Sequence, residues 1–572
     1  MNLNIDHKKT VTYDAIVVGS GISGGWAAKE LTEKGLKVLL LERGEHIEHI
    51  TGYKTAMTDP WGFPHRGRMP LNSLEEQAVQ ARTGYTVSEG SAYLFVNDKD
   101  NPYLETKRFD WMRGYHTGGR SLMWGRQSYR LGDLDFEANA KEGIAIDWPI
   151  RYKDIAPWYD YVETFAGISG SRDGLMQLPD GKFQPPMDMY CLEKHVKGSV
   201  EKKWNDRKII IGRVAHLTKP TAAQTALGRA ACQYRNLCIR GCPYGAYFST
   251  QAATLPAAMK TGRLTFRPHS IVNSLIYDEK TQKAKGVRVI DEKSGEMLEF
   301  NSRIVFLCAS ALGSTFILMN STSNRFPNGF GNDSGALGHY LMDHHFRLGA
   351  NGTYEGFEDR YYYGRRANGI YIPRYRNLPG QQKRDYLRGF GYQGGASRMN
   401  WGRGNSIEGF GAEFKEEITK PGPWNMGITA FGECLPYYEN KVELTKEKTD
   451  KWGQPILRFD AEFKENEMKM RKDMMADAGE MLESAGLKNV TTYDAGSWPG
   501  LGIHEMGTAR MGRDPKTSVL NAYNQVHAAK NVFVTDGAAM TSASCVNPSL
   551  TYMALTARAA DFAVKEMKKM NL

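Results

Sequence analysis

The opening of the chain alternates short apolar runs with a glycine-rich break. Residues 14–18 form an apolar run of the length expected for a buried parallel strand, and a glycine-rich stretch, 19–24, interrupts it. A helix-like pattern that includes Trp26 and Leu31 then continues to Gly35, and a second apolar run, 37–41, follows. The order of these segments predicts a βαβ unit.

Further apolar segments lie far downstream. Residues 304–319 look like a buried strand that continues into a helix, and 531–534 look like a short buried strand near the carboxyl end. Between them, about 331–500 alternates aromatic and polar residues with glycine-rich turns, before a charged helical stretch at 465–482. This pattern predicts an antiparallel sheet with helices, which we assign to substrate binding.

These segments predict an α/β fold with a discontinuous nucleotide-binding domain of the Rossmann type and a sheet-based α+β substrate domain. The expected division is 1–60, 216–330 and 500–572 for the nucleotide domain, 61–215 for a cofactor loop with linking segments, 331–499 for the substrate domain, and 232–243 for a cysteine loop.

The glycine-rich break has the spacing of a dinucleotide fingerprint. Gly19, Gly21 and Gly24 would allow a tight turn, a close approach of the backbone to a pyrophosphate, and close packing of helix on strand. Glu42, eighteen residues after Gly24, ends the second strand and is placed to accept hydrogen bonds from a ribose diol. The alternative, a chance glycine turn, does not account for the ordered strand, helix, strand and acid.

Composition and charge narrow the class of protein. The chain has 572 residues, 41% hydrophobic and 24% charged, which suits two domains with separate cores. The net charge of +10 is spread along the chain with no nucleic-acid module, so we expect no nucleic-acid partner; an acidic partner is a secondary possibility.

Neither the amino terminus nor the apolar segments point to a membrane. The first residues show no apolar core with a cleavage site, so we expect no signal peptide and, for the chain alone, a cytoplasmic location. The longest mostly apolar stretch, 304–319, is shorter than the ~20 residues that cross a bilayer, so we expect no transmembrane segment.

Three of the seven cysteines, Cys232, Cys238 and Cys242, fall within eleven residues. Such crowding indicates ligation rather than a disulfide framework. Three thiolates on one loop favour a [3Fe–4S] cluster, because structural zinc normally takes four ligands. A disulfide, free buried thiols and zinc remain alternatives, and the four scattered cysteines are expected in the core.

The carboxyl-terminal part carries the most specific pattern. It contains His504-Glu505-Met506-Gly507-Thr508, then Asp536-Gly537, then Asn547-Pro548-Ser549. Together with Gly118-Gly119-Arg120-Ser121, the run 338–344 and the βαβ unit, this tail resembles the glucose–methanol–choline (GMC) family of flavin oxidoreductases. The resemblance spans both ends of the chain and is weak in the middle.

The resemblance implies a role for each matching residue. His504 would be the base that removes the alcohol proton, Asn547 would orient the hydroxyl, and the hydride would pass to FAD. The residues that would contact the flavin are Gly118, Gly119, Ser121, Asp536, Gly537, Asn547 and Pro548.

Several alternatives accompany these roles. A zinc-protease motif is absent because Thr508 stands where a second histidine is required. Asn547 could instead bond the flavin or a turn before Pro548. Met123 stands where some relatives carry a histidine bonded covalently to FAD, so noncovalent FAD is expected. The run 339–345 could hold a metal, but a domain crossing is the favoured interpretation.

Within the family, the chain looks most similar to flavin subunits of bacterial sugar dehydrogenases. The resemblance implies oxidation of a sugar or glycoside, with the C3 hydroxyl of glucosides first and gluconate, sorbitol or glucose dehydrogenase subunits as rivals. It further implies electron transfer through the cluster to a cytochrome c and a small partner subunit whose signal directs export to the periplasm. An oxygen-using oxidase of the pyranose-oxidase kind and a nonredox lyase stay open as alternatives.

Overall fold

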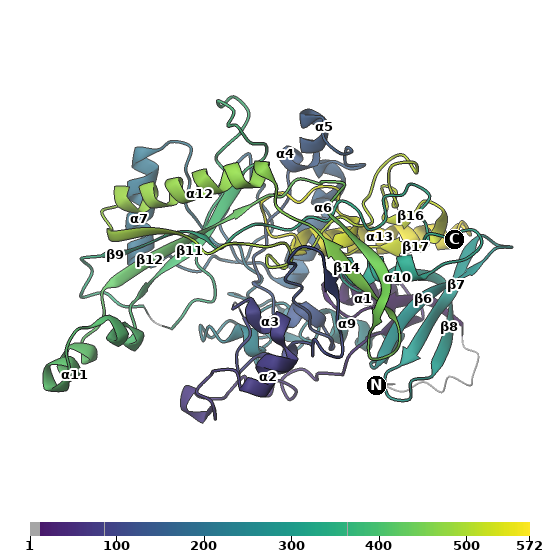
Figure 1. The fold of residues 1–572 in the computed structure, drawn as a ribbon, viewed down its shortest axis with the longest axis horizontal. Coiled ribbons are helices and arrows are strands. Elements are labelled where there is room, and N and C mark those ends of the chain that lie inside the picture. The colour runs from purple at the N-terminus through teal and green to yellow at the C-terminus, as the bar shows by residue number, and fades with distance from the viewer. Residues whose placement is uncertain (1–11, 85, 363) are drawn as a thin grey trace.

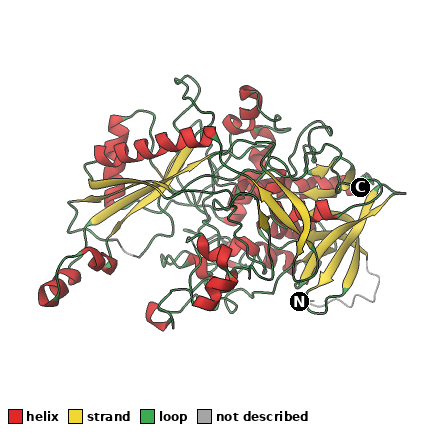
Figure 2. Ribbon diagram, in the orientation of Figure 1, coloured by secondary structure: helices red, strands yellow, loops and turns green. Residues whose placement is uncertain are grey.

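The computed structural model describes residues 12–84, 86–362 and 364–572. The first eleven residues, to which the signal-peptide prediction refers, lie outside the described residues. The chain folds as two sheet-based parts side by side, with the carboxyl terminus on the part that holds the predicted nucleotide fold (Figure 1). Both helices and strands build the molecule, as the α/β prediction requires (Figure 2).

The first sheet has eight strands and carries the predicted βαβ unit. Its main path runs β16-β17-β8-β1-β2-β5; off this path, β7 pairs with β8, and β6 pairs with β7. The strands are β1 (Thr12–Val18), β2 (Val38–Leu41), β5 (Leu264–Arg267), β6 (Ser270–Asp278), β7 (Lys283–Asp291), β8 (Met297–Leu307), β16 (Gln525–Val526) and β17 (Ala529–Val534). The predicted strands at 14–18, 37–41, 304–307 and 531–534 are all present and share this sheet.

The parallel strands end together, and this alignment creates the site. Val18 of β1 pairs with Leu41 of β2 and with Leu307 of β8, so three carboxyl ends meet at one edge. In open parallel sheets, ligands bind beyond such ends. The helices of this part are α1 (Ile22–Glu33), α9 (Thr254–Lys260), α10 (Ala311–Asn320), α6 (Tyr152–Ala166) and α13 (Ser549–Lys568).

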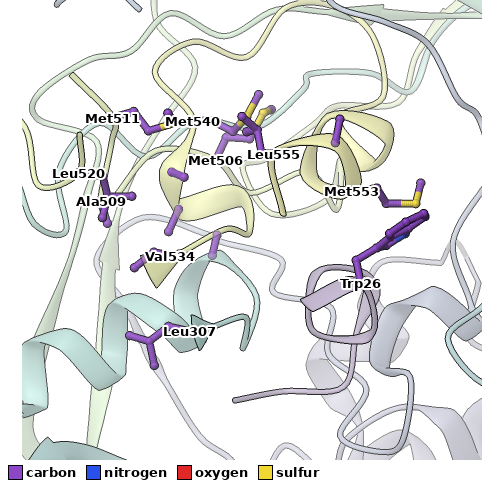
Figure 3. Packing of buried hydrophobic residues seen from close by; sticks show 14 of the residues in the cluster. Trp26, Leu307, Met506, Ala509, Met511, Leu520, Val534, Met540, Met553 and Leu555 are labelled. Carbon is purple, nitrogen blue, oxygen red and sulfur yellow. The ribbon is translucent and has the colours of Figure 1, made fainter. Parts of the chain in front are cut away.

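A large buried core fixes α1 against the carboxyl-terminal helix α13. Trp26 of α1 is fully buried and lies beside Met553 of α13 (Figure 3). Leu307 and Val534, from neighbouring strands, belong to the same core. Burial of each large apolar side chain contributes about 1.5–3 kcal/mol. The first and last elements of the chain are thereby held on one sheet.

The second sheet has six strands in the order β15-β9-β12-β11-β10-β4. They are β4 (Ile210–Ile211), β9 (Leu348–Tyr354), β10 (Ile370–Ile372), β11 (Phe390–Arg398), β12 (Trp424–Gly432) and β15 (Lys488–Asp494), and all observed pairings are antiparallel. Helices α12 (Glu465–Ser484) and α7 (Cys191–Lys203) cover one face and share its core. The helix predicted at 465–482 is therefore present, and α7 and β4 add residues from the segment 61–215 to this sheet.

Smaller elements complete the chain. A three-stranded sheet joins β13 (Lys441–Thr449), β14 (Pro455–Asp460) and β3 (Leu104–Glu105). The short helices are α2 (Leu71–Glu76), α3 (Ala78–Arg82), α4 (Asp133–Phe136), α5 (Ala138–Glu142), α8 (Ala222–Thr225) and α11 (Gly411–Thr419), which extends away from the body of the molecule (Figure 1). Among the described helices, none is both long and apolar enough to pass through a bilayer.

Candidate active site

A single large cavity lies where the two parts of the chain meet. It encloses about 510 Å³ and reaches from the glycine turn after β1 to residues of the second sheet such as Gln393. The predicted residues that line it are Gly19, Gly21, Glu42, Gly119, Ser121, His504, Asp536, Gly537 and Asn547. Gly24, Gly118 and Pro548 are not among the lining residues, and Cys238 is the cysteine of the crowded group that lines the cavity.

The glycine turn has the geometry of a phosphate cradle. Gly19 has a φ of +89°, a conformation that L side chains rarely adopt, and a Cβ on Gly24 would lie 1.7 Å from the carbonyl oxygen of Gly19. Gly21, by contrast, has only the carbonyl of Gly118 near its Cβ position, at 4.0 Å. Helix α1 starts at this turn with no side-chain cap and no acidic residue in its first turn, so its free N–H groups can receive an anion.

Glu42 lies at the end of β2 and closes this cradle. Its carboxylate accepts hydrogen bonds from the backbone N–H of Ser20 at 3.0 Å, the Ser20 hydroxyl at 2.5 Å and the Gly44 N–H at 3.0 Å. The carboxylate therefore fixes the glycine turn and still lines the cavity. Its contact with Ser20 is one that the sequence did not indicate.

The predicted flavin loop packs directly on the glycine turn. The Gly118 N–H donates to the Ser20 hydroxyl at 2.9 Å, and a Cβ on Gly118 would lie 2.1 Å from Oε1 of Gln251. The Ser121 hydroxyl accepts from the Thr250 N–H at 3.1 Å. Met123, which follows this loop, is buried and lines the cavity.

Asp536 and Gly537 lie beyond the carboxyl end of β17. Asp536 accepts a hydrogen bond from the Ser314 hydroxyl at 2.5 Å and caps a short 3₁₀ turn through the Ala538 N–H at 3.0 Å. Burial raises the pKa of Asp536 to about 6. Pro548 precedes α13 as its N-cap residue, so the chain turns into that helix directly after Asn547.

His504 and Asn547, forty-three residues apart in the chain, meet at the cavity wall. Nδ2 of Asn547 lies 3.3 Å from Nε2 of His504, and Gln393 of β11 donates to Oδ1 of Asn547 at 2.8 Å. Burial, then the neighbouring His344 and the positive charge of Arg120, lower the pKa of His504 well below its usual value. The ring is therefore neutral near pH 7 and able to accept a proton.

Two contacts that the sequence did not indicate hold the loop that carries His504. Asp343 is fully buried and accepts backbone hydrogen bonds from Gly502 at 2.9 Å, His504 at 3.1 Å and His344 at 2.8 Å. Arg120 forms a two-point ion pair with Glu505 at 2.9 and 2.6 Å. The sequence feature that could have pointed to the Asp343 contact is the run 339–345, which contains this residue.

The crowded cysteines surround a separate small hollow of about 30 Å³. Cys232, Cys238 and Cys242 all line it, together with His216, whose Nε2 lies 3.6 Å from the Cys238 sulfur. Burial and the two other thiols raise the pKa of Cys232 to about 11. Across the described parts of the chain, no group of three or more His, Cys, Asp or Glu side chains is arranged to hold a metal ion. The loop thus offers three donors to one hollow, but not a closed ligand set.

Comparison with known protein families decides the class. The amino-terminal profile of the GMC oxidoreductases matches residues 13–346, and the carboxyl-terminal profile matches 436–556. The chain belongs to the GMC oxidoreductase family. It is therefore an FAD-dependent oxidoreductase that acts on alcohols, and the resemblance inferred from the sequence motifs is confirmed.

Characterised GMC oxidoreductases match almost the whole chain at low identity. The 2-methyl-1,2-propanediol dehydrogenase of Mycolicibacterium austroafricanum is 28% identical over 96% of this chain and 94% of its own length. The fructose dehydrogenase large subunit of Gluconobacter japonicus is 23% identical over 98% and 99%, respectively. Among solved structures, a formate oxidase of Aspergillus oryzae superposes with a TM-score of 0.61 at 14% identity, covering 99% of this chain and 100% of the other.

The residues present fit the FAD that the GMC family implies. The uncapped start of α1 and the open space at Gly21 suit a pyrophosphate, and the cavity continues from there to His504. The Tyr552 hydroxyl, buried at the cavity wall, has no partner among the described residues. Such an orphaned polar atom is expected where a ligand completes the hydrogen bonds.

Proposed function

We propose that this enzyme oxidises a hydroxyl of a sugar or glycoside, with His504 as the base and Asn547 as the residue that orients the substrate oxygen. The observation that carries the proposal is the position of the His504–Asn547 pair, 3.3 Å apart, on the wall of the cavity that begins at the dinucleotide cradle. A neutral imidazole and an amide at one point match the needs of alcohol oxidation.

The chain's own residues supply the proton transfer. Nε2 of His504 takes the hydroxyl proton: the O–H bond breaks, an N–H bond forms, and the ring becomes an imidazolium. Asn547, held by Gln393, keeps its amide beside the same oxygen. The cavity that Met123 lines would hold FAD noncovalently, and FAD would supply the acceptor for the hydride of the carbinol carbon. Arg120 and Glu505 form an ion pair next to the base, and this pairing keeps the two charged side chains in fixed positions.

Our preferred substrate is a glucoside oxidised at its C3 hydroxyl. Two observations support a polyhydroxylated substrate in general: the amide groups of Gln393 and Asn547 on the cavity wall, and a relative named as a fructose dehydrogenase. Polar groups at fixed positions select hydroxyl patterns because an unmatched buried amide costs free energy. Gluconate, sorbitol and glucose are the alternative substrates.

We further propose that the three thiols bind a [3Fe–4S] cluster. Four guanidinium groups, those of Arg126, Arg229, Arg235 and Arg240, lie around the cysteine loop, and within residues 12–84, 86–362 and 364–572 none pairs with a carboxylate. Arg126, Arg229 and Arg240 are buried, and buried cations without a carboxylate partner are costly. Burial lowers the pKa of Arg229 to about 9, and the one acidic group beside it is the Cys242 thiol. An anionic thiolate cluster would supply the missing charge.

The electron acceptor we propose is a cytochrome c, reached with a small partner subunit in the periplasm. Cys238 supports this arrangement because it lines both the large cavity and the hollow of the cysteine loop. The relative named as a large subunit supports a second subunit. Co-purification after expression with candidate small subunits, followed by cell fractionation, tests partner and location together.

The test of the catalytic proposal is turnover of methyl glucoside with an artificial electron acceptor, with the product identified by NMR. We expect a 3-keto glucoside, and we expect His504→Ala to keep its FAD but lose on the order of 10² or more in turnover. Near-normal turnover of His504→Ala would remove this residue from the mechanism. The control is His65→Ala, an exposed histidine that is not among the residues lining the cavity.

The cluster has its own test. Cys238→Ser should lower the iron content and the paramagnetic signal of the purified protein while substrate still bleaches the flavin; Cys191→Ser, outside the cysteine loop, should change neither. Absence of iron in the unmodified protein, with rapid reoxidation by air, would favour an oxygen-using oxidase. A flavin that no alcohol bleaches would favour a nonredox lyase.

A further inference from the structure

His504 is in contact with a second histidine through the ring nitrogen that faces away from the substrate cavity. Nδ1 of His344 lies 2.9 Å from Nδ1 of His504, and the two rings are inclined by 72° with centroids 4.9 Å apart. His344 is buried with a relative exposure of 1% and does not line the cavity. It therefore has no direct access to a substrate, and its role must be exerted through His504.

The other nitrogen of His344 settles where its proton lies. Nε2 of His344 is 2.8 Å from the carbonyl oxygen of Ser544. A carbonyl can only accept a hydrogen bond, so Nε2 carries the proton, and a neutral imidazole has just one N–H. Nδ1 of His344 consequently carries a lone pair and requires a hydrogen-bond donor.

Among the described residues, Nδ1 of His504 is the hydrogen-bond partner of this nitrogen, so Nδ1 of His504 must carry the proton and donate it. A neutral His504 with its proton on Nδ1 has its lone pair on Nε2, the atom that faces Asn547 and the cavity. The chain of contacts from Ser544 through His344 thus determines which nitrogen of His504 is basic. Burial lowers the pKa of His344 to about 4, which keeps its ring neutral at physiological pH.

Ser544 is itself firmly placed. It has a φ of +61°, uncommon for a residue other than glycine, and its hydroxyl donates to Oδ1 of the buried Asp135 at 2.7 Å. The other oxygen of Asp135 accepts from the Gly132 N–H at 2.8 Å. Strained backbone of this kind persists only where surrounding contacts enforce it. The carbonyl that orients His344 is therefore fixed from a second segment of the chain.

We propose that His344 is a positioning residue that fixes the productive tautomer of His504. It also accepts a hydrogen bond from the Nδ1–H of the imidazolium that forms in the reaction. This inference rests on the proposed role of His504 as the base. The charged or titratable groups around the pair are Arg120, Glu505, Asp343, Tyr552 and the adjacent His345. The contact path ends on the Ser544 carbonyl, which cannot take up a proton, so the proton on His504 leaves by the cavity side.

The kinetic test compares His344→Leu with His344→Asn by anaerobic stopped-flow measurement of flavin reduction. Leucine removes the acceptor, so the limiting reduction rate should fall by about 10²-fold while the substrate Kd stays within twofold. Asparagine places a carbonyl oxygen near the position of Nδ1, so the limiting reduction rate of His344→Asn should be at least tenfold higher than that of His344→Leu. The control is His339→Asn: His339 is a half-buried histidine of the same run, bonded to the Tyr438 carbonyl, and the flavin of this variant should be reduced at the normal rate.

A spectroscopic test does not depend on turnover. With ¹⁵N-labelled histidine, the resonances missing from His504→Asn identify His504 in the unmodified protein, and we expect shifts of the Nδ1–H tautomer at pH 7.5. In His344→Leu these shifts should move toward the Nε2–H tautomer. Either an Nε2–H tautomer in the unmodified protein or an unchanged reduction rate in a folded, FAD-loaded His344→Leu would overturn the inference.

The two tests also separate this inference from the proposed function. If no sugar reduces the flavin, the substrate assignment fails, yet the tautomer measurement still decides the role of His344. If sugar reduces the flavin but His504 carries its proton on Nε2, the substrate assignment stands and the inference fails.

Discussion

At the scale of single residues, the environment of His504 makes a prediction about pH. Its pKa is lowered by burial, by His344 and by the charge of Arg120, and only the neutral ring can take a proton. As pH falls through this lowered pKa the ring becomes protonated and activity is lost. The rate of flavin reduction should therefore be nearly the same at about pH 6 as at about pH 7.5, and should fall only in more acidic buffer.

A measured pH profile checks this, with Asp343→Asn as the control. Burial and the charge of Glu505 raise the pKa of Asp343 to about 7, so this group titrates within the tested range. If His504 is the source of the acidic limb, the limb keeps its position in Asp343→Asn. A limb centred near pH 7 in the unmodified protein that vanishes in this variant would assign it to Asp343 instead.

At the scale of elements, we expect opposite effects from two glycine substitutions, one beside the turn between β1 and α1 and the other inside α7. Gly24→Ala would place a Cβ 1.7 Å from the Gly19 carbonyl, so α1 must shift and FAD should be lost from the purified protein. Gly198→Ala, inside α7 with nothing within 4 Å of the added Cβ, should keep FAD and gain about 0.5–1 kcal/mol of stability. The flavin-to-protein absorbance ratio and the thermal midpoint measure both, and a yellow, normally stable Gly24→Ala would contradict the account of this turn.

Elements with strong local patterns were predictable from the sequence, and contacts between distant loops were not. The runs at 14–18 and 37–41 are continuous apolar strands, and their pairing through Val18 and Leu41 follows from the βαβ rule. The bond from Ser20 to Glu42 joins two loops whose approach depends on the finished sheet. The Nδ1 contact of His344 with His504 spans 160 residues and has no local pattern. The ligand set of the cysteine loop remains a prediction for the same reason.

At the scale of the whole molecule, a buried ion network joins the second sheet to the segment around α5. Arg388, just before β11, pairs with Glu433 at 3.0 Å and with Glu142 of α5 at 2.6 Å. Arg388→Leu would remove the ion-pair partner of the buried Glu433, leaving only the more remote charge of Arg374, and should cost about 3–5 kcal/mol of stability. The sequence could not reveal this network, because its members are separated by up to 291 residues, from Glu142 to Glu433.

The pH dependence of that cost follows from Glu433. Burial raises its pKa to about 7, and loss of Arg388 raises it further. When the pKa of a carboxyl group is higher in the folded than in the unfolded protein, the folded state loses stability as the pH rises from the unfolded-state pKa through the folded-state pKa. The thermal midpoint of Arg388→Leu should therefore lie further below that of the unmodified protein at about pH 8 than at about pH 5, and Arg388→Leu combined with Glu433→Leu should recover most of the deficit. Equal deficits at both pH values would contradict an unpaired carboxylate as the cause.

The most direct test of the central claim is the absorbance of the FAD-loaded protein under anaerobic conditions, before and after addition of methyl glucoside. The account predicts that the flavin bands bleach in the unmodified protein and stay unchanged over the same time in His504→Ala. Bleaching at equal rates in both proteins would contradict the role of His504. Flavin bands that no sugar, glycoside or polyol bleaches would contradict the claim that this cavity oxidises a sugar hydroxyl.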